Sequence, residues 1–323
     1  MVQSGANTVN MNIRRQSTLR APAVTASIAL HNGQHTRLVM RPSEIGSGLK
    51  FIRTDIKDRD NVVPVRPDLV TGVRNCTTLS NAAGVSVSTI EHLLAALSAA
   101  GIDNLDIELD GSELPALDGS SEPFLQLIEQ VGVLQQPAPR RYVKVLETVE
   151  ARSGDMWARI SPCDRLELDV TIDFTEEAIG HQRLQIVPDV RSFRERMASA
   201  RTFARLHEVA ALQAAGLSKG GSYDNAIIVD DDKVLNPQGL RFDDEFVRHK
   251  ALDLLGDLYL GGPILGRVTT FKSGHGLNHD LLMKFYGTPS AWTFTTMPMP
   301  EIEPLIVPGM GQENAPALTS LPA

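Results

Sequence analysis

One histidine and two aspartates recur at helical spacing in the stretch from residue 245 to residue 275. His249, Asp253 and Asp257 are each four residues apart, so a helix over residues 246–258 would place all three along one face. Imidazole and carboxylate groups on one face can bind a divalent metal ion. They could equally form a semi-buried ion pair one turn apart. A metal site would need a further ligand from elsewhere in the chain.

The opposite side of the same expected helix is apolar, which suits packing against a sheet. Gly256 interrupts this apolar side. Because a glycine in a helix interior costs about 1 kcal/mol relative to alanine, its position between Asp253 and Asp257 predicts that something approaches the helix backbone closely there. The apolar stripe consists of Val247, Ala251, Leu254, Leu255 and Leu258.

A second candidate group lies in the stretch 86–100, which reads SVSTIEHLLAALSAA. Ser88 followed by Glu91 forms a capping box and predicts a helix that starts at Ser88. His92 would then lie in the first turn, where the helix dipole keeps imidazole neutral and able to bind a metal. Glu91 beside it could act as a general base on water. The alternative is that Glu91 only caps the helix and that His92 is only a hydrogen-bonded residue at its start.

The composition is that of a globular protein. The chain has 323 residues, which is enough for two ordinary domains or one large one. Apolar residues make up 42% and charged residues 22%, close to the averages of soluble domains, so we expect neither a disordered nor a membrane protein. The formal net charge of -8 argues against nucleic acid or an anionic membrane surface as the main partner.

The cysteine count and the chain ends bear on location. Cys76 and Cys163 are too few for a disulfide framework and fit a reducing compartment. Residues 1–24 hold no uninterrupted apolar run, so neither a signal peptide nor a membrane span is expected. We therefore expect a cytoplasmic protein, with residues 1–15 as a flexible leader and residues 298–323 as a loose tail.

Alternating apolar and polar residues predict strands in both halves of the chain, mixed with short helices. A β-hairpin is expected to turn at residues 31–34, HNGQ. Further helices are expected over residues 124–134, 192–203 and 207–217. The mixture favours a fold with both helices and sheets.

A domain boundary is expected at residues 135–141, QQPAPRR, which combine two prolines with polar residues. It divides a domain of residues 16–136 from a domain of residues 137–297. Each half has a helix followed by an Asp-Asn pair and a strand, at Asp103-Asn104 and at Asp224-Asn225. This order suggests an internal duplication, although so few matching residues could agree by chance.

Seven stretches of the chain resemble one known family. The whole match runs in order from about Ser17 to about Leu282. The seven stretches are VSTIEHLLAAL, GIDNLDIEL, PALDGSSEPF, SARTF, GGSYDNAIIV, LNPQGLRFDDEFVRHKALDLLGDL and FKSGHGLNHDLL. They are similar to the zinc-dependent UDP-3-O-acyl-N-acetylglucosamine deacetylases of bacterial lipid A biosynthesis. The resemblance implies an α+β fold of two similar layered sheet-and-helix domains with the active site between them. It implies hydrolysis of the N-acetyl group of an acylated UDP-N-acetylglucosamine.

The resemblance also implies the metal and its ligands. Zn²⁺ would be held by His92, His249 and Asp253. Two histidines, one carboxylate and an open fourth position are a ligand set of catalytic zinc sites. On this model Glu91 is the general base.

Three further residues take chemical roles by the same resemblance. His275 would be a cation that stabilises the oxyanion and is able to protonate the leaving amine. Asp257 would orient the His275 imidazole and keep it charged. Thr202 would polarise the amide carbonyl through its hydroxyl.

Substrate contacts are implied in the same way. Phe203 and Lys250 match positions at the sugar and polar end of the substrate, and Lys272 is a candidate for the diphosphate side. An insert near residues 203–230 would enclose the acyl chain. Ordinary core packing would give the same apolar pattern. The apolar lining expected from this insert is Leu206, Val209 and Leu217.

Two features bear on how closely the chain follows the family. Glu176 and Glu177 stand where relatives often have His-Pro, which affects the expected shape of that loop. Cys76 matches a cysteine near the metal in relatives, and a buried thiol without a ligand role is an equal alternative.

Other functions are weighed against the deacetylase. A catalytically silent homologue that binds a nucleotide sugar or a protein partner is the main alternative. A serine hydrolase is disfavoured because the chain has no G-x-S-x-G motif, and no P-loop or dinucleotide fingerprint occurs. A fused dehydratase has no room in residues 283–323. We expect a monomer that acts on a small molecule.

Overall fold

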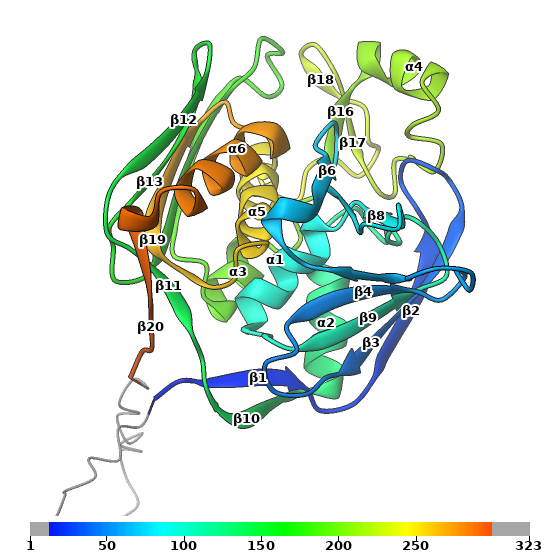
Figure 1. Ribbon diagram of the computed structural model, residues 1–323. Helices are drawn as coiled ribbons and strands as arrows, with labels where there is room; N and C mark the ends of the chain where they lie inside the picture. The colour runs from blue at the N-terminus through cyan, green and yellow to red at the C-terminus, as the bar shows by residue number, and fades with distance from the viewer. Residues whose placement is uncertain (1–12, 299–323) are drawn as a thin grey trace, which may run out of the picture.

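The computed structural model describes residues 13–298, so residues 1–12 of the expected leader and residues 299–323 of the expected tail lie outside it. In Figure 1 two halves, each with a sheet outside and helices inside, face each other through their helices. This arrangement confirms the α+β fold of two similar halves. The α-helices of the described residues are α1 (Glu91–Ala100), α2 (Glu122–Val131), α3 (Val190–Arg196), α4 (Leu206–Ala214), α5 (Glu245–Tyr259) and α6 (His275–Tyr286), with 3-10 turns at Pro67–Leu69 and Pro289–Ala291.

The first half is built on a five-stranded sheet in the order β2-β3-β9-β4-β5. Its first two strands form the predicted hairpin, with Ile28 opposite His35 across the turn. The central strand β9 is parallel to β4, and α1 and α2 lie on one side of the sheet (Figure 1). The strands are β2 (Ala23–Ile28), β3 (His35–Pro42), β4 (Leu49–Arg53), β5 (Val62–Pro64) and β9 (Leu105–Leu109).

The second half is built on a seven-stranded sheet whose central strand, β19, pairs with β13 on one side and with β11 and β14 on the other. Helix α5 packs on β14 and β15, and α6 packs on β12 and β13. The strands are β11 (Tyr142–Val145), β12 (Val149–Ser153), β13 (Met156–Ser161), β14 (Leu166–Asp173), β15 (His181–Ile186), β19 (Ile264–Phe271) and β20 (Trp292–Thr295).

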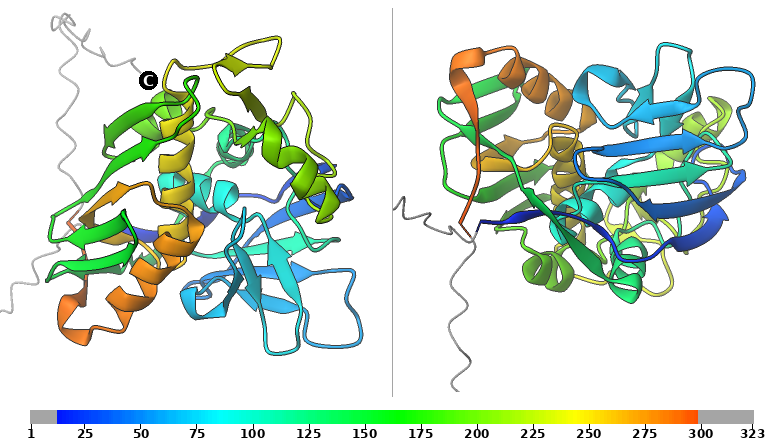
Figure 2. Two further views of the ribbon diagram at one scale, coloured as in Figure 1. Left: turned by 90° about the horizontal axis from the view of Figure 1, so that it is seen from above. Right: turned by 60° about the horizontal axis from the view of Figure 1, so that its bottom comes forward.

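Three small sheets complete the described residues. The ribbon β1–β10 carries the chain along the base of both halves before β11 begins (Figure 2). Sheets β6-β7-β8 and β16-β17-β18 project beside helices α1 and α5, and α4 packs on the sheet β16-β17-β18. The strands are β1 (Arg15–Leu19), β10 (Val133–Pro139), β6 (Val70–Gly72), β7 (Thr78–Ser80), β8 (Ser86–Ser88), β16 (Phe203–Arg205), β17 (Ile227–Asp230) and β18 (Lys233–Val234).

The halves meet where α1 packs against α5. A methyl group added at Gly256 would lie 2.0 Å from the backbone carbonyl oxygen of Glu91. The close approach predicted from this glycine is therefore confirmed, and the approaching group is the start of α1. As a result, Glu91 and His92 are held beside the polar face of α5.

The predicted capping box at Ser88 is wrong. Ser88 is the last residue of β8, where it pairs with Thr78, and its hydroxyl donates to the carbonyl of Ser112. Helix α1 begins at Glu91, and the carboxylate of Glu91 accepts a hydrogen bond from the backbone N–H of Thr77. The Ser88 hydroxyl and the Glu91 carboxylate, which the capping box would pair with the helix start, are thus bound by distant parts of the chain.

The helix predicted over residues 192–203 is shorter than expected. Helix α3 starts after Asp189, which caps it by accepting from the backbone N–H of Ser192, and it ends at Arg196. Beyond it the chain becomes extended, and Phe203 pairs with Ile227 in a parallel ladder. The sheet contact therefore overrides the local helical pattern.

The two Asp-Asn segments compared in the sequence are not structural equivalents. Residues after Asp103 form β9, the centre of the five-stranded sheet, whereas those after Asp224 form β17 in a small separate sheet. The equivalent units are α1 followed by β9 and α5 followed by β19, each a helix leading to a central strand. Residues 135–139 belong to β10, and the division into residues 16–136 and 137–297 stays a prediction.

Candidate active site

His92 of α1 and His249 and Asp253 of α5 come together in the space between the two halves. Their ligand atoms all lie within 4.8 Å of one another. Asp253 Oδ1 is 3.6 Å from His92 Nε2 and 3.3 Å from His249 Nε2. This oxygen is buried and has no hydrogen-bond partner among the described residues. A buried, unpaired carboxylate oxygen is costly, and a metal ion between the three side chains would compensate it.

The surrounding bonds suit this group to a cation. His249 Nδ1 donates to the carbonyl of Ala200 at 3.0 Å, which leaves the Nε2 lone pair facing Asp253. Burial lowers the pKa of His249 to about 4, so its imidazole is neutral at pH 7. The Lys250 amine lies 2.8 Å from Asp253 Oδ2. Burial opposes ionisation of Asp253, but neighbouring groups that include the positively charged Lys250 hold its pKa well below the usual range.

His275, the first residue of α6, lies across the site from this group. Its Nδ1 is 2.8 Å from Asp257 Oδ2, and Asp257 also accepts from Thr77 Oγ1 at 2.7 Å and from Asn278 Nδ2 at 2.9 Å. Burial alone would lower the pKa of His275, but the charge of Asp257, reinforced by Glu91, raises it to about 9. His275 is therefore a cation at neutral pH.

Glu91 precedes the candidate ligand His92 in α1 and lies beside His275. Its side chain is buried, with Oε1 3.8 Å from His275 Nε2 and Oε2 bound to the backbone N–H of Thr77 at 3.1 Å. Burial raises the pKa of Glu91, and the charge of His275 partly offsets this effect. A carboxylate with raised pKa beside an imidazolium forms a proton-accepting and proton-donating pair.

A cavity of about 560 Å³ opens from these residues towards β16 and α4. Of the residues expected to contact substrate, Thr202, Phe203 and Lys250 line it together with Leu206 and Val209. The Phe203 ring stands edge to face with Phe246, its centroid 5.1 Å away. The cavity has an apolar wall on the α4 side and polar groups at the metal-binding side.

Two of the expected substrate contacts do not line this cavity. Leu217 follows the end of α4, where Gly216 adopts a φ of +80° and turns the chain away, and Leu212 lines the wall instead. The Lys272 amine is held by Asp155 at 3.2 Å and by Asp173 at 3.0 Å. These ion pairs direct the Lys272 charge away from the cavity lining.

Sequence reasoning missed three polar residues of the site. Thr77 and Asn278 bind Asp257, and neither stands at a spacing that relates it to α5. His31 lines the cavity from the β2–β3 turn, and both of its ring nitrogens are buried with no partner among the described residues. The signal available for His31 is a histidine in an HNG turn, and this pattern by itself predicts only the turn of the hairpin.

Comparison with known proteins shows the family of the chain. Residues 16–286 match the family model of LpxC, UDP-3-O-acyl N-acetylglycosamine deacetylase. The chain belongs to this family. Its members are metalloenzymes, and among the described residues the group of His92, His249 and Asp253 is the candidate metal-binding group.

Curated relatives carry the name UDP-3-O-acyl-N-acetylglucosamine deacetylase. The protein from Phenylobacterium zucineum is 46% identical over 282 residues, which cover 87% of this chain and 96% of the relative. The protein from Pseudoalteromonas translucida is 42% identical over 308 residues, which cover 94% of this chain and 99% of the relative. Among the described helices, none has both the length and the apolar composition needed to cross a membrane.

Proposed function

We propose that this family member removes the N-acetyl group of UDP-3-O-acyl-N-acetylglucosamine by hydrolysis, releasing acetate and UDP-3-O-acyl-glucosamine in lipid A biosynthesis. The observation that carries the proposal is the unpaired, buried Oδ1 of Asp253 between two imidazole nitrogens, with Glu91 and His275 facing it. A silent homologue would have no need of this costly arrangement.

We propose Zn²⁺ as the metal, held by His92, His249 and Asp253. Two imidazole nitrogens and one carboxylate oxygen are a ligand set that zinc takes in catalytic sites, where a fourth position stays open. When bound, zinc supplies Lewis-acid chemistry, polarising the amide carbonyl and lowering the pKa of water to about 7.

The proton transfers are assigned to residues of this chain. Glu91 takes a proton from the attacking water, and its buried carboxylate is close enough to His275 for one charge to stabilise the other. His275 stabilises the negative charge that develops on the amide oxygen and then protonates the leaving amine. Asp257 holds the imidazole in place through its 2.8 Å contact with Nδ1. This bond directs Nε2 towards the substrate side.

Binding of the substrate is assigned to the cavity. The Thr202 hydroxyl donates a hydrogen bond to the amide carbonyl. Lys250, which forms an ion pair with Asp253, contributes positive charge beside the sugar. The acyl chain lies along Phe203 and the α4 side, where Leu206, Val209 and Leu212 line the wall. Each buried CH₂ contributes about 0.8 kcal/mol, so the chain supplies much of the affinity.

We propose that the enzyme works as a monomer in the cytoplasm. All of the residues assigned above come from one chain, so the site requires no partner subunit. The cysteine usage supports the cytoplasmic location.

The test is acetate release from acylated and unacylated UDP-N-acetylglucosamine by zinc-loaded, metal-free and reloaded protein. We expect release to require both the acyl chain and the metal, and His92→Ala to abolish it. Arg159→Ala, on the outer sheet, serves as the control with unchanged activity. Full activity in the metal-free protein, or no release by the zinc-loaded protein, would rule the proposal out.

A further inference from the structure

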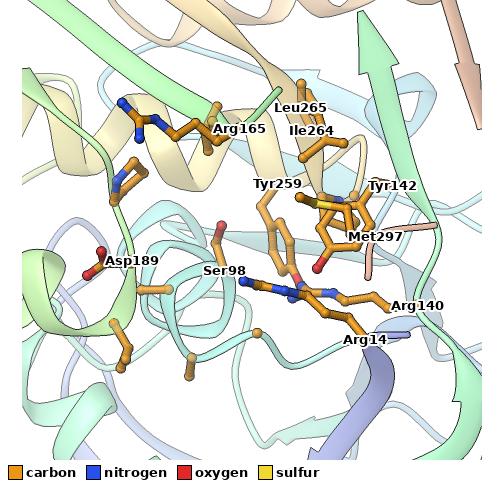
Figure 3. Close-up of a pocket in the computed structure, with 18 of the residues that line it drawn as sticks. Arg14, Ser98, Arg140, Tyr142, Arg165, Asp189, Tyr259, Ile264, Leu265 and Met297 are labelled. Carbon is orange, nitrogen blue, oxygen red and sulfur yellow. The ribbon is translucent and has the colours of Figure 1, made fainter. Parts of the chain in front are cut away.

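A second cavity lies at the other end of the α1–α5 helix pair, and it shares no lining residue with the candidate active site (Figure 3). Its volume is about 730 Å³. The C-terminal end of α1, residues Leu255 and Leu258 of α5, and the crossing from β10 to β11 form its walls. The function proposed above makes no use of this cavity.

One side of the second cavity is basic. Arg14 directly precedes β1 and Arg140 directly follows β10, and the Arg140 backbone N–H donates to the Arg14 carbonyl at 2.8 Å. The Arg140 guanidinium is matched by Asp103 at 2.9 Å and also donates to the Tyr259 hydroxyl at 3.1 Å. Arg14 has no carboxylate partner within residues 13–298, and Figure 3 shows its guanidinium reaching into the cavity. Its positive charge is available to an anion.

The Tyr142 hydroxyl adds an unused donor at the same side. Tyr142 is only 5% exposed, and its hydroxyl has no hydrogen-bond partner in the described part of the chain. The Arg140 guanidinium lies 5.2 Å from the centroid of its ring. Because a buried hydroxyl without a partner is costly, this group points to a ligand oxygen that it could bind.

The rest of the lining is mostly apolar. Four arginines border the cavity, and Asp189 is the one acidic residue among the described residues that borders it. This local excess of positive charge contrasts with the net charge of -8 of the whole chain. Positive charge at one side and hydrocarbon beyond it match an amphiphilic anion. The apolar part of the lining includes Leu255, Leu258, Ile264 and Leu265.

We propose that this cavity is a second binding site, for a phosphate or carboxylate anion that carries an apolar chain. Arg14 binds the anion together with the Tyr142 hydroxyl, and the chain lies along α5 and β19. The shared chemistry is an anionic head on a hydrocarbon body, whether it comes from a free fatty acid derivative or from a phosphorylated lipid precursor.

The test uses decyl phosphate, below its micelle concentration, titrated into the zinc-loaded full chain with labelled leucine, isoleucine and valine methyl groups. We expect saturable NMR shifts at Ile264 and Leu265 that are separate from any shifts at Val209 in the first cavity. A decyl carboxylate should shift the same methyl groups. The Kd of the carboxylate against that of the phosphate then shows which of the two sources of the anionic head the site prefers. Decanol and inorganic phosphate supply the chain and the charge alone, and each should bind at least tenfold more weakly.

Matched variants locate the anion. Arg14→Ala should raise the Kd of decyl phosphate about tenfold, the usual size of a lost charge-assisted hydrogen bond. Tyr142→Phe should raise it a few-fold, and Arg159→Ala should leave it unchanged. The methyl spectrum of each variant shows whether it folds. An unchanged Kd in both Arg14→Ala and Tyr142→Phe would overturn the proposal.

Two further outcomes would also overturn it. One is equal affinity for decanol or for inorganic phosphate, since the site would then not select an amphiphilic anion. The other is binding seen only when the chain is ended at Pro298. Residues 299–323 begin two positions after Met297, which lines the cavity, and that result would make this segment the natural occupant.

Discussion

The backbone carbonyl oxygen of Glu91 lies 2.0 Å from the point that a methyl group at Gly256 would occupy. This contact joins the two halves at the position where Glu91 and His92 must reach the α5 ligands. A larger residue at position 256 would push α1 away from His249 and Asp253. The distance between the halves, and with it the geometry of the metal-binding group, therefore depends on the absence of one side chain.

We expect Gly256→Ala to reduce both stability and activity. Overpacking of this kind costs about 1–3 kcal/mol, which outweighs the gain in helix propensity of about 1 kcal/mol. Denaturant titration and acetate release measure the two effects. Gly276→Ala in α6 is the matched control, because its new methyl would meet Val73 at 3.6 Å, an ordinary contact. Equal stability of the two variants would contradict the role given to Gly256.

The pH dependence of the rate should follow His275. The imidazolium is the reactive form, and its pKa is raised to about 9, so activity persists through neutral pH and falls as the pH rises through about 9. Asp257→Asn removes the charge that raises this pKa. We expect its alkaline limb to move at least one pH unit lower in profiles of kcat/KM, which report the free enzyme. An alkaline limb that stays in place would assign that titration to another group.

Much of α5 could be predicted from the sequence because its information is local. His249, Asp253 and Asp257 follow one helical period, and Gly256 marks the contact with another element. The partner of that contact could not be read from α5 itself, since it depends on how α1 docks. The resemblance to a known family supplied His92 as the third ligand.

Residues that follow no helical or strand period could not be predicted, because their contacts also depend on how the elements pack. Thr77 and Asn278 reach Asp257 from a strand edge and from α6, and only the packed fold brings them within 2.9 Å of it. At Ser88 a strand ladder replaced the expected helix cap. Local pattern thus predicted which faces are polar, whereas tertiary packing decided which partners those faces meet.

The buried ion pair between Arg201 and Glu245 should hold the start of α5 in place. Arg201 Nε lies 2.9 Å from Glu245 Oε1, and the same carboxylate accepts from the Arg201 backbone N–H. We expect Glu245→Ala to lower the free energy of unfolding by about 3–5 kcal/mol, because it leaves the buried Arg201 unpaired. Chemical denaturation measures this loss. Arg191→Ala, which breaks an exposed pair with Glu195, should give no measurable change.

His31 should contribute to substrate binding rather than to folding. Its ring lines the active-site cavity, and neither ring nitrogen has a partner within the described residues. We expect His31→Ala to raise KM about tenfold with little change in kcat, since a lost hydrogen bond to a polar substrate group has roughly this value. Steady-state kinetics separate the two constants. A fall in kcat alone, with KM unchanged, would contradict a binding role.

Metal binding should stabilise the fold measurably because Asp253 Oδ1 is buried without a partner in the described residues. Adding Zn²⁺ to metal-free protein should raise Tm, and a metal at 1,000 times its Kd contributes about 4 kcal/mol to the free energy of unfolding. His92→Ala removes one nitrogen ligand, so most of this rise should disappear. Mg²⁺ prefers oxygen ligands in octahedral geometry and should give little rise at the same concentration. An equal rise in His92→Ala, or with Mg²⁺, would place the stabilising ion elsewhere.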